Sequence, residues 1–274
     1  MKKIVTIIVF FLLLMGTNSC EEKIDVPLST AAPRLVIDAA IKWTKGTLGK
    51  EQKIKLSTTT NFYSNIIPVV SGAVVFITDA DNTVFNFIET PGTGEYICTD
   101  FNPVINGTYV LTVIHNGQTY TAEETLKPVV SIERIEQVND SGFTGDDIII
   151  KIFFTDDGTR NDFYLFKFKL ATKPMPSYGV EKDEFFQGNE IFGLYADENL
   201  EAGQNLEISM GGISERYYNY MNILLSISGG NAGSPFSSPP ATVRGNIVNT
   251  TNDKNYALGY FSLAEVDVMN YIVE

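Results

Sequence analysis

The stretch Thr108–Glu124, TYVLTVIHNGQTYTAEE, decides the fold. Its first half alternates large apolar residues (Tyr109, Leu111 and Val113) with threonine and valine. This is the period of a strand with one buried face. Asn116-Gly117 then supplies the dipeptide of a tight hairpin turn, and the chain returns in the same alternation. The sequence therefore predicts an antiparallel β-hairpin.

The same pattern extends along the chain on both sides of this hairpin. Short alternating or apolar runs occur at 35–41, 53–57, 73–77, 83–88 and 95–99. Gly94-Glu95-Tyr96 and Gly107-Thr108-Tyr109 each place a glycine two residues before a tyrosine, as in the corner of immunoglobulin-like sandwiches. We predict a mainly β protein whose residues 34–127 form an immunoglobulin-like or prealbumin-like β-sandwich.

A second β-rich domain is predicted over residues 128–274, because Pro128 interrupts strand pairing after the finished hairpin. Its expected strands cover 148–154, 163–170, 190–196 and 205–210, with a final pair at 243–249 and 256–263. Apolar residues recur at helical spacing after Ile213, and Gly229-Gly230 ends the run. We therefore expect one amphipathic helix near 213–228.

The N-terminus has the layout of a secretory signal. Lys2 and Lys3 precede an uncharged apolar run, Ile4–Met15, which is too short to span a bilayer as a helix. Small and polar residues follow, and then Cys20. A cysteine at the expected cleavage point predicts a bacterial lipoprotein, with residues 1–19 as signal peptide, Cys20 as the lipid-attachment site and residues 20–33 as a lipidated tether.

Two questions stay open at this end of the chain. Thr17 stands where leucine is usual, so ordinary secretion with an unmodified Cys20 is the alternative. We expect an outer-membrane, lipid-anchored protein. The acidic Glu21-Glu22 resembles a surface-export signal but is also what any solvated tether carries, so the face of the membrane is undecided. If Cys20 carries lipid, Cys98 has no intramolecular disulfide partner, and its strand-like setting predicts a small buried side chain.

Composition narrows the function. The chain has 33 acidic and 20 basic residues, and a formal net charge of −13. Nucleic acid repels such a body, so we expect no nucleic-acid partner. Its single histidine, His115, adjoins a turn. The sequence therefore offers neither a good candidate for the general base of a nucleophilic enzyme nor a usual set of zinc ligands. We predict no enzyme and no cofactor or metal, with calcium at the Asp-rich turns 79–82 and 156–162 left open.

Ligand or partner binding remains. Several aromatic residues could form a stacking platform, although most are expected to fill the core: Trp43, Phe185, Phe186, Phe192, Tyr195, Tyr217, Tyr218 and Tyr220. Tyr218 lies off the helix's apolar stripe, and Phe236 lies in a Gly/Pro/Ser loop. We take these two residues and Arg244 as candidate contacts.

Several segments together resemble one family, the Bacteroidetes envelope lipoproteins called the domain of unknown function 4249 family. They are Pro33–Asp38, Val70–Val75, Gly107–Val113, Tyr120–Thr125, Pro239–Ile247 and Ala257–Phe261. The most specific part is the C-terminal pairing of Arg244-Gly245-Asn246-Ile247 with Leu258-Gly259-Tyr260-Phe261. The resemblance marks these positions without assigning them a role.

The resemblance implies an envelope lipoprotein, often encoded beside a TonB-dependent receptor, with no established activity and no catalytic residues to transfer. We therefore expect a non-enzymatic accessory or ligand-binding partner of a TonB-dependent transporter, held to outer-membrane lipid through Cys20. The alternative is a surface adhesin or structural β-sandwich lipoprotein without a transport role.

Overall fold

A computed structural model describes residues 32–61, 64–141, 147–184, 186–228 and 243–274. The predicted signal peptide, Cys20 and most of the predicted tether lie outside these ranges, as does Phe236. The described chain is mainly β, as predicted. The expected helix near 213–228 is also confirmed, and it is helix α2 (Glu215–Ser228).

The strands form one long twelve-stranded sheet, which we call the ladder, and one small three-stranded sheet. In spatial order the ladder is β11 (Ser177–Lys182), β10 (Phe163–Leu170), β13 (Asn205–Gly212), β15 (Leu258–Ile272), β1 (Leu35–Thr44), β2 (Gln52–Thr58), β5 (Glu95–Cys98), β4 (Val84–Thr90), β3 (Val74–Asp79), β6 (Thr108–His115), β7 (Gln118–Thr125) and β14 (Val248–Asn249). The small sheet is β12 (Glu190–Ala196), β9 (Asp147–Thr155) and β8 (Arg134–Ser141).

The quoted stretch forms the predicted hairpin. Strands β6 and β7 pair antiparallel from Thr108↔Thr125 to His115↔Gln118. Asn116 and Gly117 both have positive φ, 49° and 71°, as a two-residue turn of this hand requires. The predicted corner forms at Tyr109, whose hydroxyl donates to Asn102 O, seven residues upstream, at 2.8 Å. The Tyr96 hydroxyl instead donates to the distant Val70 O at 3.0 Å.

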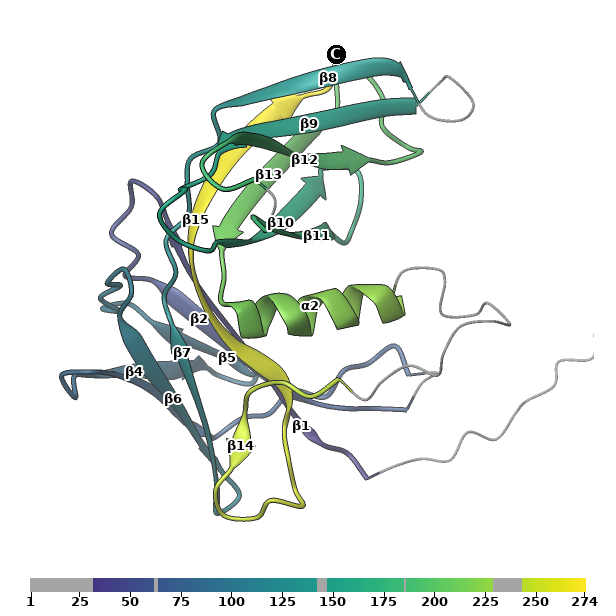
Figure 1. Ribbon diagram of the computed structural model, residues 1–274. Helices are drawn as coiled ribbons and strands as arrows, with labels where there is room; N and C mark the ends of the chain where they lie inside the picture. The colour runs from purple at the N-terminus through teal and green to yellow at the C-terminus, as the bar shows by residue number, and fades with distance from the viewer. Residues whose placement is uncertain (1–31, 62–63, 142–146, 185, 229–242) are drawn as a thin grey trace, which may run out of the picture. The chain divides into compact units, whose positions relative to one another are not determined.

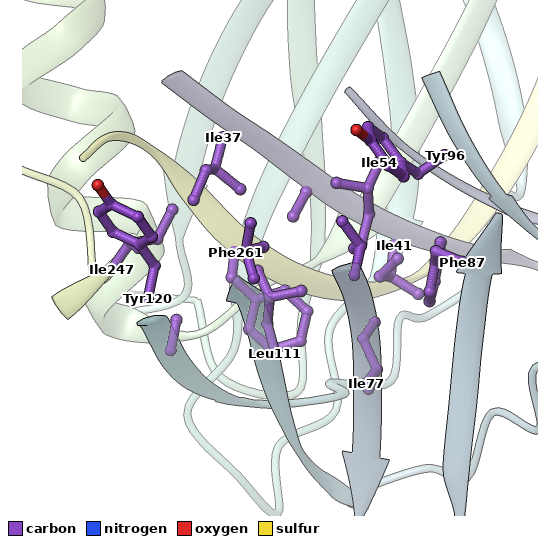
Figure 2. Packing of buried hydrophobic residues seen from close by; sticks show 14 of the residues in the cluster. Ile37, Ile41, Ile54, Ile77, Phe87, Tyr96, Leu111, Tyr120, Ile247 and Phe261 are labelled. Atoms are coloured by element: carbon purple, nitrogen blue, oxygen red, sulfur yellow. The ribbon is translucent and has the colours of Figure 1, made fainter. Parts of the chain in front are cut away.

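The alternating residues of these strands bury a first core, which we call core 1. Its members include Ile37, Ile54, Ile77, Leu111 and Phe261, all fully buried (Figure 2). Burial of this apolar area is the main favourable term in folding. Core 1 draws on both ends of the chain, because Ile247, Phe261 and Leu263 belong to it together with residues 35–126.

A second group of buried residues, core 2, lies between β8, β9, β12 and the strands β10 and β13. Tyr164, Phe166, Phe168 and Leu170 supply one face of β10, as its alternation predicts. Phe154 packs edge-on against Tyr164, with ring centroids 4.9 Å apart.

Strand β15 serves both cores. It pairs in parallel with β1, from Val36↔Leu258 to Thr44↔Val266, and antiparallel with β13. Phe261 and Leu263 enter core 1, whereas Met269 and Tyr271, on the same face, pack against core 2. Figure 1 shows it as the long yellow strand that runs past both groups of strands.

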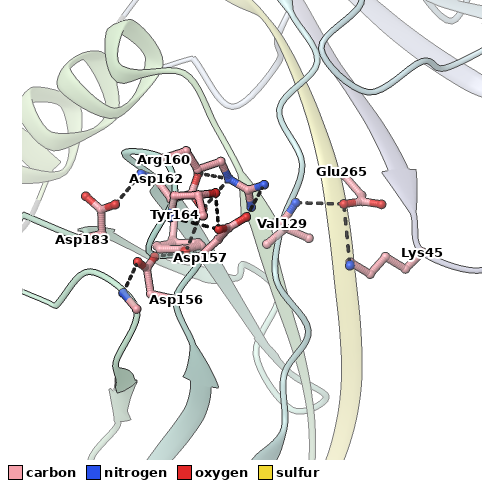
Figure 3. A network of polar contacts seen from close by, with 11 residues as sticks. Lys45, Val129, Asp156, Asp157, Arg160, Asp162, Tyr164, Asp183 and Glu265 are labelled. Atoms are coloured by element: carbon pink, nitrogen blue, oxygen red, sulfur yellow. Dashed lines mark hydrogen bonds and ion pairs between the residues drawn. The ribbon is translucent and has the colours of Figure 1, made fainter.

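Two acidic residues of β15 lie on this same face, between the cores. Glu265 accepts a hydrogen bond from Val129 N at 2.9 Å and pairs with Lys45 (Figure 3). Asp267 accepts a hydrogen bond from Ile132 N at 2.8 Å. They satisfy backbone N–H groups of the segment that joins the first strands to the later ones. That segment is therefore held along β15.

Three details differ from the sequence expectations. The predicted pairing of 243–249 with 256–263 is wrong, because β14 pairs with β7 and β15 pairs with β1 and β13. Strands β8 and β11 were not predicted; β11 lies within a proline-bearing stretch that reads as irregular. The division at residue 127 stays a prediction; β15 pairs with strands on both sides of it.

Candidate functional site

A cavity lies between α2 and the face of the ladder that is turned away from the two cores. It has a volume of about 620 Å³. Along β1 the even-numbered residues from Val36 to Lys42 line it, while the odd-numbered ones from Leu35 to Ile41 belong to core 1; Ile41 also reaches the lining. Along β15 every second residue from Tyr260 to Val266 lines the cavity, together with Gly259. The size and mainly apolar lining are those of small-molecule sites.

Helix α2 covers this cavity because its first turn is tied to β7. Ser214 caps the helix, since its hydroxyl oxygen accepts from Tyr217 N at 3.2 Å and its O–H donates to the buried Glu124 at 3.0 Å. The Arg216 guanidinium donates to Glu123 O at 2.6 Å. Met221 is the buried residue on the helix's inner face. The helix is thus anchored at its start.

Tyrosine rings dominate one part of the lining. The Tyr260 ring lies 4.6 Å from that of Tyr217 and 4.7 Å from that of Tyr220, centroid to centroid. A fourth ring, Tyr178 from β11, lines the same cavity. Burial raises the pKa of Tyr217 to about 12, and burial also raises the pKa of Tyr178, Tyr220 and Tyr260. At neutral pH all four hydroxyls therefore keep their proton and can donate a hydrogen bond.

Three charged side chains line the cavity: Asp38, Lys42 and Lys167. Asp38 lies directly opposite Lys55 on β2, an opposite-charge pair across antiparallel strands. The Lys167 amine pairs with Glu207 at 3.1 Å. Among the described residues none forms an ion pair with Lys42. Burial and, second, the neighbouring Lys167 lower the pKa of Lys42, and Asp38 and Glu207 partly offset that shift. As a residue, Lys42 is exposed.

The structure places the predicted contact residues beside this cavity rather than inside it. Tyr218 is half-buried, packs on Phe163 with ring centroids 5.3 Å apart, and lines a separate polar pocket of about 360 Å³. Arg244 is exposed, and its guanidinium carbon lies 4.1 Å from the centre of the Tyr256 ring, a cation–π contact. Phe236 is among the residues that the structure does not describe.

The other aromatic candidates divide between cavity, core and surface. Tyr217 and Tyr220 line the cavity, whereas Tyr195 is buried in core 2 and Trp43 packs against core 1. The remaining described pair, Phe186 and Phe192, is exposed. Phe185 lies outside the described residues. Sequence reasoning missed Tyr178 and Tyr260 as lining residues. The signal that could have found Tyr260 is its even position in an alternating strand.

The two segments that carry the family resemblance meet beside the cavity. The Asn246 side chain accepts from Phe261 N at 2.9 Å and donates to Phe261 O at 2.8 Å, replacing a neighbouring strand. A Cβ on Gly245 would lie 1.7 Å from Gly259 O, so only glycine permits this approach. Gly259 itself has φ +95° and packs on Ile37 O. These residues hold the β15 backbone at the point where Tyr260 turns to the cavity.

In the Asp-rich turns, aspartate carboxylates accept hydrogen bonds from groups of the protein itself. Asp156 accepts from the Tyr164 hydroxyl at 2.6 Å, Asp162 from Arg160 at 2.7 Å, and Asp183 from Asp162 N at 2.7 Å (Figure 3). In the other turn, Asp79 accepts from the backbone of Asp81 and Thr83, the turn-forming role of aspartate. Within the described ranges no three His, Cys, Asp or Glu side chains converge as a metal site.

The remaining candidates for chemistry lie elsewhere. His115 ends strand β6 next to the hairpin turn. Cys98 is fully buried, as predicted, and burial raises its thiol pKa to about 11, which keeps it protonated and unreactive at neutral pH. In the part of the chain that the structure covers, no helix has both the length and the apolarity to cross a bilayer.

Over the described residues, these observations define a β-rich protein in which helix α2 lies over a cavity lined by tyrosines. The chain belongs to the family described as "Domain of unknown function (DUF4249)", whose model matches residues 21–269. No protein of curated function matches it by sequence.

Solved structures give only distant likenesses. A two fibronectin type III domain segment of chicken tenascin is 12% identical, with 66% of this chain and 90% of that chain covered and a TM-score of 0.22. A DUF4785 family protein from Legionella pneumophila is 8% identical, with 65% and 52% covered and a TM-score of 0.27. A cytokine receptor complex is 6% identical, with 65% and 82% covered and a TM-score of 0.25.

Proposed function

We propose that this protein is a non-enzymatic, lipid-anchored outer-membrane protein that binds a small ligand as the accessory of a TonB-dependent transporter. The observation that carries the binding role is the cavity of about 620 Å³ beneath α2, with its tyrosine rings and its few charged groups. Such a combination of apolar walls and sparse polar groups is how proteins hold small molecules.

The lipid anchor rests on the sequence. A charged start, a short apolar run and Cys20 at the cleavage point form a lipoprotein signal. A diacylglyceryl group on Cys20, with the further acyl chain that bacterial lipoproteins commonly carry, would anchor the body stably. The transporter role is what the family resemblance implies. A ligand-binding accessory fits that role because it needs a cavity and no catalytic residues.

Lipidation is tested by growing the producing bacterium with a labelled fatty acid. The wild-type protein is expected to carry label and to sediment with the outer membrane, and Cys20→Ser is expected to lose both. Cys98→Ser is the matched control, because it removes the other cysteine of the chain, and its label is expected to stay. Label that survives in Cys20→Ser contradicts the anchor.

The transporter role is tested by solubilising membranes in mild detergent and isolating the tagged protein. A TonB-dependent receptor is expected to co-purify in stoichiometric amount, with its gene beside this one. Repeated isolation of the protein alone overturns the accessory role. If cells lacking the protein then also lose adhesion to surfaces, the adhesin alternative replaces it. Protease treatment of intact cells decides the face of the membrane.

A further inference from the structure

We propose that the cavity beneath α2 binds an aromatic carboxylate, with the ligand's ring against the tyrosines and its carboxylate against the Lys42 amine. This inference rests on the proposed binding function and names its ligand class. It is argued from three features of the cavity: the pairing of its charges, the nature of its walls, and the spacing between the two.

The charges single out Lys42. Of the three charged side chains in the lining, Asp38 faces Lys55 across the strand pair and Lys167 is paired with Glu207. Lys42 lines the cavity and forms no direct ion pair among the described residues, although Asp38 and Glu207 act on it from further away. Lys42 is exposed as a residue, but partial desolvation of its amine against the apolar lining has a free-energy cost that a nearby anion reduces. The lowered pKa of Lys42 reflects this cost, and a bound carboxylate would offset it.

The residues that line the cavity favour a ligand with an aromatic ring. Four tyrosines converge on the cavity from three elements: Tyr217 and Tyr220 from α2, Tyr260 from β15, and Tyr178 from β11. Aromatic rings gain from offset or edge-on contact with another ring beyond the area they bury. The tyrosine hydroxyls, which stay protonated, could accept or donate to substituents on the ligand's ring.

The spacing along β1 separates the two ends of the ligand. Asp38 pairs in register with Tyr260, and Lys42 pairs with Ala264 four residues further along. Four residues of strand are about 13 Å, which is within reach of a lysine side chain and a two-ring aromatic acid together. Asp38 lies at the tyrosine end, where it pairs in register with Tyr260. Its carboxylate still acts on the Lys42 amine over a distance, but it forms no ion pair with that amine, whose hydrogen-bonding positions stay open to a ligand carboxylate.

The test compares 2-naphthoate with 2-naphthamide, which share the ring system and differ in the charge, by titration calorimetry on the lipid-free protein from residue 21 onward. Naphthoate is expected to bind about ten- to one-hundred-fold more tightly, the range of a hydrogen bond to a charged group. Lys42→Met is expected to remove that preference, and Lys42→Arg to retain it. Lys53→Met is the matched control, because Lys53 is an exposed lysine of β2 that pairs with Glu95 of β5. It should leave the preference for naphthoate unchanged.

A second variant places the site. Ala40 lines the cavity between Asp38 and Lys42, so Ala40→Phe fills the space and should abolish binding. A thermal melt and far-UV circular dichroism of each variant show whether it is folded. If Ala40→Phe fails to fold, the Lys42→Met and Lys42→Arg pair alone decides the proposal, because it changes charge without adding volume at the wall.

The outcomes separate this inference from the proposed function. Equal binding of the two naphthalenes, or a preference that persists in Lys42→Met, overturns the carboxylate assignment and leaves a ligand-binding cavity in place. Tighter binding of dodecanoate than of 2-naphthoate contradicts the aromatic body. If neither naphthalene binds, the ligand class is wrong, and co-purification of a TonB-dependent receptor still tests the accessory role independently.

Discussion

The two faces of the β1–β15 strand pair differ in almost every respect. On one face Ile37, Ala39 and Phe261 are fully buried in a packed core. On the other, only a few residues away, Asp38 and Lys42 line a cavity. The backbone pairing is the same for both, since it is one parallel ladder. The difference lies in what covers each face: strands cover the first and, in the part of the chain that the structure describes, helix α2 covers the second.

This contrast indicates that the two faces of one sheet have different roles. A packed face tolerates no loss of volume, because neighbours cannot relax into the space. A face beside a cavity already lacks some contacts and can change its side chains at a smaller cost in stability. Stability should therefore reside on the core face, and binding on the cavity face. Each prediction below tests this division.

The largest effect is expected at Phe261. Phe261→Ala removes a fully buried ring from core 1 and should lower the free energy of unfolding by about 3–5 kcal/mol. Val266 lies on the cavity face of the same strand and is buried in a small cluster with Ile213 and Ala264. Val266→Ala should cost about 1–2 kcal/mol, the transfer energy of the atoms removed. Urea denaturation of both variants measures the difference. Equal losses would mean that the two faces are packed alike.

The next effect is expected at Gly259, where the strand has φ +95° and a Cβ would lie 2.0 Å from Ile37 O. Gly259→Ala should destabilise the protein by roughly 2–3 kcal/mol, through overpacking and backbone strain together. Gly46 also has positive φ, but nothing lies within 4 Å of its Cβ position. Gly46→Ala therefore isolates the strain, and it should cost only about 1 kcal/mol. A Gly259→Ala loss no larger than that of Gly46→Ala would rule out the close approach.

Much of the β structure follows from local patterns, and these glycines show where local patterns stop. The alternation in Thr108–Val113 and the Asn116-Gly117 turn suffice to predict the β6–β7 hairpin, because its partners are adjacent in sequence. The pairing of β1 with β15 joins segments more than 200 residues apart. Alternation shows that each is a strand but not which strand it meets. The predicted local partner for 256–263 was therefore wrong.

The cavity could be predicted only in part. The polar half of β1, with Asp38 and Lys42, reads as a face turned to water. Whether that water is bulk solvent or a cavity depends on where α2 lies, and this is set by the contact of Ser214 with Glu124, ninety residues away in sequence. Strand β11, which brings Tyr178 to the cavity, was missed because the prolines near it favour an irregular assignment.

A smaller effect is expected at Asn246, whose side chain takes the place of a paired strand beside Phe261. Asn246→Ala leaves one backbone N–H and one C=O of β15 without their partner. It should lower the free energy of unfolding by about 1–2 kcal/mol. Hydrogen exchange should show the amide of Phe261 as the most affected in β15. Unchanged protection at Phe261 would contradict the role assigned to Asn246.

The smallest effect on stability is expected on the cavity face, at Lys42. Its folded-state pKa is lowered below the ordinary value of 10.5 by burial and by Lys167. Between the lowered pKa and 10.5 the unfolded chain binds more protons at this residue, so its contribution makes stability rise with pH in that window. Lys42→Met should keep the free energy of unfolding at neutral pH within about 0.5 kcal/mol of wild type and flatten that rise.

Urea denaturation of wild type and Lys42→Met, from neutral pH toward 10.5, measures this difference. Subtraction of the two curves cancels the groups they share, such as the tyrosines. A large loss of stability in Lys42→Met would show that the amine supports the fold, and the cavity face would then not be reserved for binding. If Lys42→Met instead keeps its stability and loses its affinity for naphthoate, this one substitution shows that the two faces have different roles. The core face, with Phe261, would then stabilise the fold, and the cavity face, with Lys42, would bind the ligand.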